Sequence, residues 1–111
     1  MDLVESTYKV TENFPSSERY GIINQLRRAA VSVASNIAEG HARSTGDYVR
    51  HLSISRGSLA EMETQFMVSN RLGFLSKSDE ETLLKACDQV GRMLGTLRRK
   101  LTVRRSRVPN P

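Results

Sequence analysis

Basic residues gather at the end of this chain, where no acidic residue lies among them. Residues 89–111 contain seven Lys or Arg and no Asp or Glu, whereas residues 1–88 contain ten basic and twelve acidic residues, a balance of −2. Unneutralised basic side chains contact phosphate groups, so we predict a nucleic-acid-binding surface. Its members are Arg92, Arg98, Arg99, Lys100, Arg104, Arg105 and Arg107. No aromatic residue is interleaved with them, so binding is expected to be only weakly specific for sequence. The alternative is a solvated tail that only promotes solubility.

A second group of polar residues is expected on two neighbouring antiparallel helices. Its members are Arg27, Arg28, Asn36, Glu39, Arg43, Arg56, Ser58 and Glu61. The favoured interpretation is a structural network of hydrogen bonds and ion pairs that fixes helix register or a subunit contact. The alternative is a ligand or nucleic-acid pocket. Such a pocket needs arginines left unpaired, and the nearly equal numbers of acidic and basic residues disfavour it.

The sequence shows no pattern typical of a catalytic, metal or cofactor site. It contains no Glu-x-x-His pair, phosphate-binding loop, nucleophile elbow or zinc spacing. His51 follows Asp47 by one helical turn, which fits a partly exposed pair, whereas Glu61 and Glu63 point to different faces. The single cysteine, Cys87, lies in an apolar stripe and is expected to be a core residue. We therefore predict that the protein is not an enzyme and has no metal, cofactor or small-molecule substrate. An enzyme would need a cleft that joins His51 or Glu61 to another subunit.

Length and composition favour one small all-helical domain. The 111 residues are 38% hydrophobic and 5% aromatic, with no Trp, which suits a helical bundle better than a β-sandwich. No apolar run approaches the roughly 18 residues of a membrane span, and the first residues lack the features of a signal peptide. The protein is expected to be soluble and cytoplasmic, without a membrane partner.

The first half of the chain predicts two helices. A short helix is expected to end before Asn13, where a Phe-Pro dipeptide breaks it. The second is expected to be capped by Ser16 or Ser17, to run to about Glu39, and to end with Gly40 in the left-handed conformation. Ala and Ser dominate its second half, so it is predicted to be the tightly packed central helix.

The second half predicts two longer helices. Ser44 is expected to cap a third helix of some 27 residues that ends at Gly73, and Ser78 to cap a fourth that ends near Thr102. The seam of the third helix comprises Tyr48, Leu52, Ser55, Leu59, Met62, Phe66 and Ser69. The seam of the fourth comprises Leu83, Cys87, Val90, Leu94, Leu97 and Leu101.

Together these elements predict an all-α, antiparallel up-down-up-down four-helix bundle with a shortened first helix. Residues 1–102 form the bundle, and residues 103–111 form a basic, disordered tail. The third helix would be about 40 Å long and the first only about 16 Å, so part of the groove beside the first helix is uncovered. Either the natural chain begins upstream of Met1 or another subunit fills this gap.

Several motifs resemble those of one family. They are Phe14-Pro15, Glu18, Tyr20-Gly21, residues 25–30, residues 35–40, Arg43, Gly57-Ser58-Leu59, Glu61, Glu63 and residues 72–75. With these the chain resembles the bacterial four-helix-bundle proteins, also called 23S rRNA intervening-sequence proteins, over most of residues 7–101. Two departures are the absence of the usual longer first helix and Ala34 in place of a frequent proline.

The resemblance implies an antiparallel four-helix bundle that assembles into a ring-like homopentamer, often encoded within an insertion in a ribosomal RNA gene. It implies no established activity. Related accessory proteins of diversity-generating retroelements share the pentameric, basic character and bind nucleic acid.

We therefore predict a non-catalytic homo-oligomer, pentameric by resemblance, whose basic C-terminal residues bind RNA or other nucleic acid. The alternative is a protein-protein interaction scaffold in which the basic surface meets an acidic partner and nucleic acid has no role. Both contacts are electrostatic and weaken with salt, so competition by generic RNA is needed to separate them.

Overall fold

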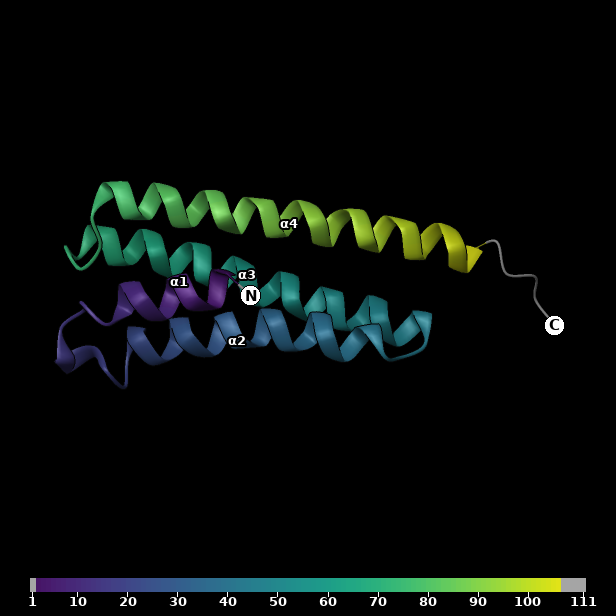
Figure 1. The fold of residues 1–111 in the computed structure, drawn as a ribbon, viewed down its shortest axis with the longest axis horizontal. Helices are drawn as coiled ribbons and strands as arrows, with labels where there is room; N and C mark the ends of the chain where they lie inside the picture. Colours follow the sequence, from purple (N-terminus) through teal and green to yellow (C-terminus); the bar gives the residue numbers. More distant parts are fainter. Residues whose placement is uncertain (1, 107–111) are drawn as a thin grey trace.

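Four α-helices and one short 3₁₀ helix make up the fold of residues 2–106, the part of the chain that the computed structural model describes; side chains are described for residues 2–103. The elements are α1 (Asp2–Thr11), η1 (Ser16–Glu18), α2 (Ile22–His41), α3 (Thr45–Arg71) and α4 (Lys77–Ser106). Helix α2 packs against α3, α3 against α4, and α1 against both α2 and α4. The predicted all-α four-helix bundle with a short first helix is thus confirmed (Figure 1). Within residues 2–106, no helix combines the length and the apolar content that a membrane crossing requires.

The core is formed where the apolar stripes of the helices meet. All seven seam residues predicted for α3 are buried, as are Leu26, Ala30 and Val33 of α2. In α4, Leu83, Cys87 and Leu94 are buried, whereas Val90, Leu97 and Leu101 are only partly covered. Figure 1 shows α1 beside only one half of the bundle. The second half of α4 therefore lacks the neighbour that covers its first half.

Helix α1 is attached to α2 by polar as well as apolar contacts. Thr7 and Thr11 are buried, and their hydroxyls donate to the carbonyls of Leu3 and Thr7 at 2.7 Å. Arg27 of α2 donates from Nε to the Thr11 hydroxyl at 2.9 Å. Its guanidinium also lies over the ring of Tyr8, 4.6 Å from the ring centroid. Arg27 of α2 thus contacts α1 at both Tyr8 and Thr11, in addition to the apolar packing of Leu3 in the core.

The start of α2 differs from the prediction. Residues Ser16–Glu18 form a separate 3₁₀ turn, closed by hydrogen bonds from the Glu18 amide to the Pro15 carbonyl at 2.9 Å and from the Arg19 amide to the Ser16 carbonyl at 3.1 Å. The chain turns once more before α2 begins at Ile22. Its N-cap is Gly21, which makes no side-chain cap. The prediction that a serine caps α2 was wrong because Pro15 starts a tighter turn there.

Gly40 is required for space rather than for a left-handed turn. Helix α2 continues through Gly40 to His41, and within the described residues the positive φ angle belongs to Gly73 alone. A Cβ atom on Gly40 would lie 2.8 Å from the Cβ of His51 and 3.2 Å from Cδ2 of Tyr48. The predicted stop at Gly40 was therefore wrong. The residue allows α2 and α3 to approach closely where they meet at the end of the bundle.

The ends of α3 are as predicted, but α4 begins earlier. Ser44 caps α3 by accepting a hydrogen bond from the Asp47 amide at 3.4 Å, and Gly73 follows the helix with φ 81°. At α4 the cap is Ser76, whose hydroxyl accepts from the Asp79 amide at 3.1 Å, and not Ser78. The Ser-x-x-acid spacing occurs at both serines, so the sequence pattern fits either.

Helix α4 also ends later than predicted. It continues to Ser106, past the end expected near Thr102, whose hydroxyl donates to the Arg98 carbonyl at 2.8 Å. No Gly or Pro lies between Gly95 and Pro109, so nothing in the sequence breaks the helix at Thr102. The expected boundary between bundle and tail thus falls inside α4, and residues 107–111 lie outside the described residues.

Candidate nucleic-acid interface

The basic residues near the end of α4 point in several directions. At about 100° per residue, the successive side chains of Arg98, Arg99 and Lys100 fan around the helix, and all three are exposed. Arg99 donates to the Thr96 hydroxyl at 3.3 Å. Within the described side chains, Arg98 and Lys100 have no ion-pair partner. The side chains of Arg104 and Arg105, and Arg107 as a whole, lie outside the described part.

Arg92 differs from the other members of the predicted surface because it has an acidic partner. Its Nε lies 3.1 Å from the Asp88 carboxylate one turn earlier on α4. Both side chains are well exposed, so this ion pair contributes little stability. It nevertheless lowers the net positive charge that Arg92 brings to a phosphate.

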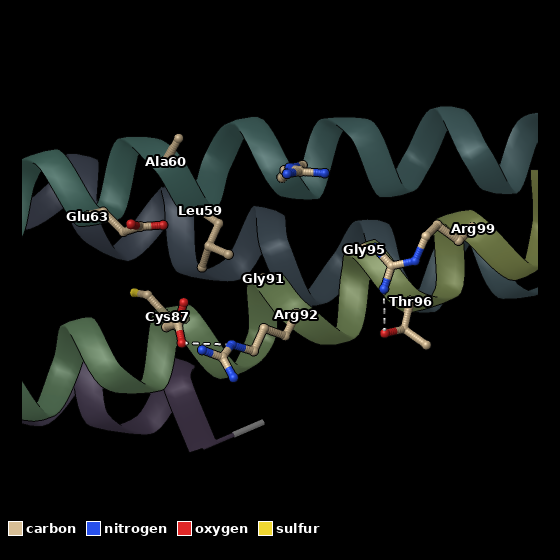
Figure 2. Close-up of a pocket in the computed structure, with 11 residues that line it drawn as sticks. Leu59, Ala60, Glu63, Cys87, Gly91, Arg92, Gly95, Thr96 and Arg99 are labelled. Atoms are coloured by element: carbon tan, nitrogen blue, oxygen red, sulfur yellow. Dashed lines mark hydrogen bonds and ion pairs between the residues drawn. The ribbon is translucent and has the colours of Figure 1, made fainter.

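A groove between α3 and α4 gathers arginines from both helices. It has a volume of about 570 Å³, and Arg56 of α3 and Arg92 and Arg99 of α4 line it. Gly91 and Gly95 contribute no side chain to its α4 side, and Figure 2 shows them on the same stretch of helix as Arg92 and Arg99. The sequence did not link Arg56 to the basic end of α4, because that link depends on the register of α3 against α4.

Acidic and apolar residues of the same two helices also line this groove. Glu63 and Asp88 line it together with Leu59 and Cys87. Cys87 is fully buried, and burial, with a smaller contribution from the charge of Glu63, raises the pKa of its thiol to about 12. The prediction that Cys87 is a core residue is confirmed. Its thiol remains protonated at neutral pH and is not an activated nucleophile.

The second group of predicted residues does not form one network. Ser58 donates to the Ser32 hydroxyl at 2.8 Å, which links α3 to α2. Asn36 Oδ1 lies 2.8 Å from Nδ1 of His51, and the Asn36 amide also donates to the Ser32 carbonyl at 2.9 Å. The Ser58–Ser32 and Asn36–His51 contacts both join α2 to α3 and fix the register of the two helices. Arg27 instead contacts α1, as described above.

The charged members of that group are dispersed. Glu39, in the last turn of α2, and Arg43, just beyond the end of that helix, form an exposed ion pair. Its hydrogen bond holds the pKa of the Glu39 carboxyl below its usual value and raises the pKa of Arg43. Arg28 and Glu61 line a polar hollow of about 320 Å³ between α2 and α3, together with Ser58. Arg56 lies at the α3–α4 groove, and among the described side chains no ion pair joins α2 to α3.

His51 is a residue whose environment the sequence did not reveal. It was expected to form a partly exposed pair with Asp47, but it is 8% exposed and contacts Asn36, while the ion-pair partner of Asp47 is Arg50 at 4.0 Å. Its Nε2 atom is buried without a hydrogen bond among the described residues. His51 directly precedes Leu52 of the predicted α3 seam and follows Tyr48, another seam residue, by three positions, and this spacing could have indicated burial. Among the described residues, no three His, Cys, Asp or Glu side chains lie close enough together to hold a metal ion.

Comparison with known proteins agrees with the fold and the motifs. A family model described as 23S rRNA-intervening sequence protein matches residues 1–96. None of the curated proteins compared with the chain matches it. The matched region spans α1, α2 and α3 and continues to Thr96 of α4, so it stops just before Arg98. The chain belongs to the 23S rRNA-intervening sequence protein family.

Proposed function

We propose that this protein is a non-catalytic helical-bundle protein that binds RNA or other nucleic acid through the basic end of α4. One observation carries the proposal: Arg98 and Lys100 are exposed without ion-pair partners among the described side chains. Figure 1 shows the end of α4 projecting beyond the turn that joins α2 and α3. A nucleic-acid backbone can reach a projecting helix end from several sides.

The chemistry of this surface favours phosphate contacts over base recognition. Arginine and lysine side chains neutralise phosphates and release counterions, which gives binding that weakens steeply as salt rises. The described basic residues from Arg92 to Lys100 have no exposed aromatic side chain between them that could stack on a base. Affinity at this surface is therefore expected to depend on charge and not on nucleotide sequence.

We further propose that the protein assembles with copies of itself, as a pentamer by its resemblance to the family. Four large apolar side chains on α3 and just after it are 40–57% exposed: Ile54, Met67, Val68 and Leu72. Val68 and Leu72 are four positions apart, the spacing that places side chains on one side of a helix, and an apolar surface there supports a protein contact. Assembly would present several basic helix ends together and raise their effective concentration for one RNA. A monomer mass in light scattering at micromolar concentration would overturn this proposal.

The test of nucleic-acid binding compares two charge-matched variants. In the first, Arg98, Arg99 and Lys100 are each replaced by Gln. In the control, Lys9, Arg71 and Lys85 are replaced by Gln; these side chains are also exposed and unpaired within the described region but lie elsewhere. Binding of a labelled structured RNA is measured at low and moderate salt. We expect the first variant to lose most of its affinity and the control to retain it.

Two results would contradict the proposal. Equal losses in both variants would indicate a response to net charge and not to the end of α4, and absence of binding at low salt would remove the function altogether. Competition separates the alternative function, a scaffold for an acidic protein. Generic unlabelled RNA is expected to displace the labelled RNA fully, and an acidic polypeptide of the same charge only weakly.

A further inference from the structure

Two exposed tyrosines lie on the surface formed by α1, α2 and the turn before α2. Tyr20, two residues before α2, is 88% exposed, and Tyr8 on α1 is 40% exposed. Figure 1 places the start of α2 and the free end of α4 at opposite ends of the bundle. Any site at Tyr20 is therefore separate from the basic end of α4.

The tyrosines border two adjoining hollows. A hollow of about 520 Å³ is lined by Arg19, Tyr20, Asn24 and Arg27, among others. A second hollow, of about 550 Å³, is lined by Asn24, Arg27 and Tyr8, among others. Because Asn24 and Arg27 line both, the two hollows adjoin on the α1–α2 side of the bundle. We call the two together the tyrosine groove.

The tyrosine groove is basic although the surrounding bundle is not. Arg19, Arg27 and Arg28 line it against one acid, Glu12. Residues 1–88 as a whole carry a balance of −2. Arg19 and Arg28 have no ion-pair partner among the described side chains, so both remain available to an anion.

One arginine of the groove is already fixed in position. Arg27 donates to the Thr11 hydroxyl at 2.9 Å, and its guanidinium stacks over the Tyr8 ring at 4.6 Å. Little side-chain freedom remains for it to lose when a ligand binds. Tyr20, by contrast, leaves its ring exposed to solvent and free to receive a flat partner.

We propose that the tyrosine groove binds single-stranded nucleic acid, with an unpaired base stacked on Tyr20 and phosphates held by Arg19 and Arg28. Aromatic rings beside guanidinium groups are the combination that binds unpaired bases and their backbone. The Asn24 side chain between the hollows can donate to and accept from a base edge. A duplex keeps its bases stacked on each other, so it cannot use Tyr20 in this way. The inference depends on the proposed function for the class of ligand but uses a different surface.

Tyrosine fluorescence provides a direct test, because the chain has three Tyr and no Trp, and Tyr48 is buried. The full chain is titrated with a single-stranded oligouridine of about eight nucleotides and, separately, with a blunt RNA duplex of equal length. We expect saturable quenching by the single strand and none by the duplex. Both substitutions at Tyr20 remove the reporting tyrosine, so the affinity of these variants is measured by anisotropy of an end-labelled oligouridine. Replacing Tyr20 with Ala is expected to weaken single-strand affinity about tenfold, whereas Tyr20→Phe keeps an aromatic ring and most of the affinity.

The outcomes distinguish this inference from the proposed function. The Arg98, Arg99, Lys100 variant is expected to keep its single-strand affinity while losing duplex affinity, and Tyr20→Ala is expected to lose single-strand affinity while keeping duplex affinity. If Tyr20→Ala bound the single strand as well as wild type, the tyrosine groove would be excluded while binding at α4 could stand. Equal quenching by polyglutamate of the same charge would also overturn the inference, because it would indicate an acidic protein partner. Since Tyr20 is exposed, neither Tyr20→Ala nor Tyr20→Phe should change the helical circular dichroism of the protein.

Discussion

Gly40 of α2 lies directly against His51 of α3, so the two helices approach each other closely at this glycine. A Cβ there would meet the Cβ of His51 at 2.8 Å, and an atom attached directly to backbone cannot move away unless a helix moves. We expect Gly40→Ala to lower the free energy of unfolding by about 1–3 kcal/mol, despite the better helix propensity of alanine. Urea denaturation measures the change.

Gly57 provides the matched control for this substitution. It lies in the interior of α3, and a Cβ at this position would meet nothing within 4 Å. Gly57→Ala is expected to raise the free energy of unfolding by up to about 1 kcal/mol, because alanine favours the helix. If the Gly40 variant were stabilised as much as the Gly57 variant, the close approach of α2 and α3 at His51 would be contradicted.

The Cys87 thiol gives a second prediction at this scale. Its pKa is about 12 in the folded protein against an ordinary value of 9.0, so the native thiol stays neutral over a pH range in which the unfolded thiol ionises. Iodoacetamide at pH near 8 is therefore expected to modify the denatured protein and spare the native one. Relative to high pH, the neutral buried thiol favours the folded state. This contribution to the free energy of unfolding is complete below the pKa of the unfolded thiol and is lost as pH rises from about 9 toward 12.

Comparison with Cys87→Ala isolates this effect from other groups that titrate in alkali. The difference in free energy of unfolding between wild type and the variant is expected to shrink as pH rises above 9. A difference independent of pH, or rapid alkylation of the native protein, would show that the thiol is not buried as described.

The helix caps give a prediction at the scale of elements. Ser76 accepts a hydrogen bond from the Asp79 amide, whereas the Ser78 side chain has no such contact. We expect Ser76→Ala to cost about 1 kcal/mol of stability and Ser78→Ala, its control at the same end of α4, to cost little. Denaturant midpoints of the two variants measure the difference. A larger loss for Ser78→Ala would contradict the start of α4 at Lys77.

The sequence predicted buried helix faces better than it predicted helix ends. The α3 seam was predicted correctly at all seven positions because a long alternation of apolar residues leaves one consistent buried face. Ser76 and Ser78 each have an acidic residue three positions later, so local spacing could not choose between them. The start of α2 and the role of Gly40 depend on a 3₁₀ turn and on a facing residue of another helix, neither of which a single-helix pattern contains.

Of the candidate surfaces, the sequence predicted only the part whose residues are adjacent in the chain. The run from Arg98 to Lys100 is visible in the sequence because its members are adjacent. The link from Arg56 to Arg99 requires two helices in register, and the link from Tyr8 to Tyr20 requires α1 to fold against α2. Each surface that joins distant parts of the chain therefore became apparent only with the tertiary structure.

At the scale of the whole molecule, the two proposed surfaces bind nucleic acid through different interactions and lie toward opposite ends of the bundle. The end of α4 offers the exposed charges of Arg98, Arg99 and Lys100 to phosphates, so its contribution depends on counterion release. The tyrosine groove adds an aromatic ring, and stacking depends far less on salt. A long RNA with both paired and unpaired segments could engage both ends, and its affinity would then exceed that of either segment alone.

Salt dependence separates these two contributions. For a duplex, each phosphate neutralised contributes about −0.9 to the slope of log affinity against log salt, so removing Arg98, Arg99 and Lys100 is expected to flatten the slope by about 2–3. The control variant at Lys9, Arg71 and Lys85 is expected to keep the wild-type slope. For a single strand, Tyr20→Ala is expected to lower affinity by a similar factor at every salt concentration. Equal slopes for wild type and the α4 variant would show that those three residues do not contact phosphates, whatever the affinity at one salt concentration.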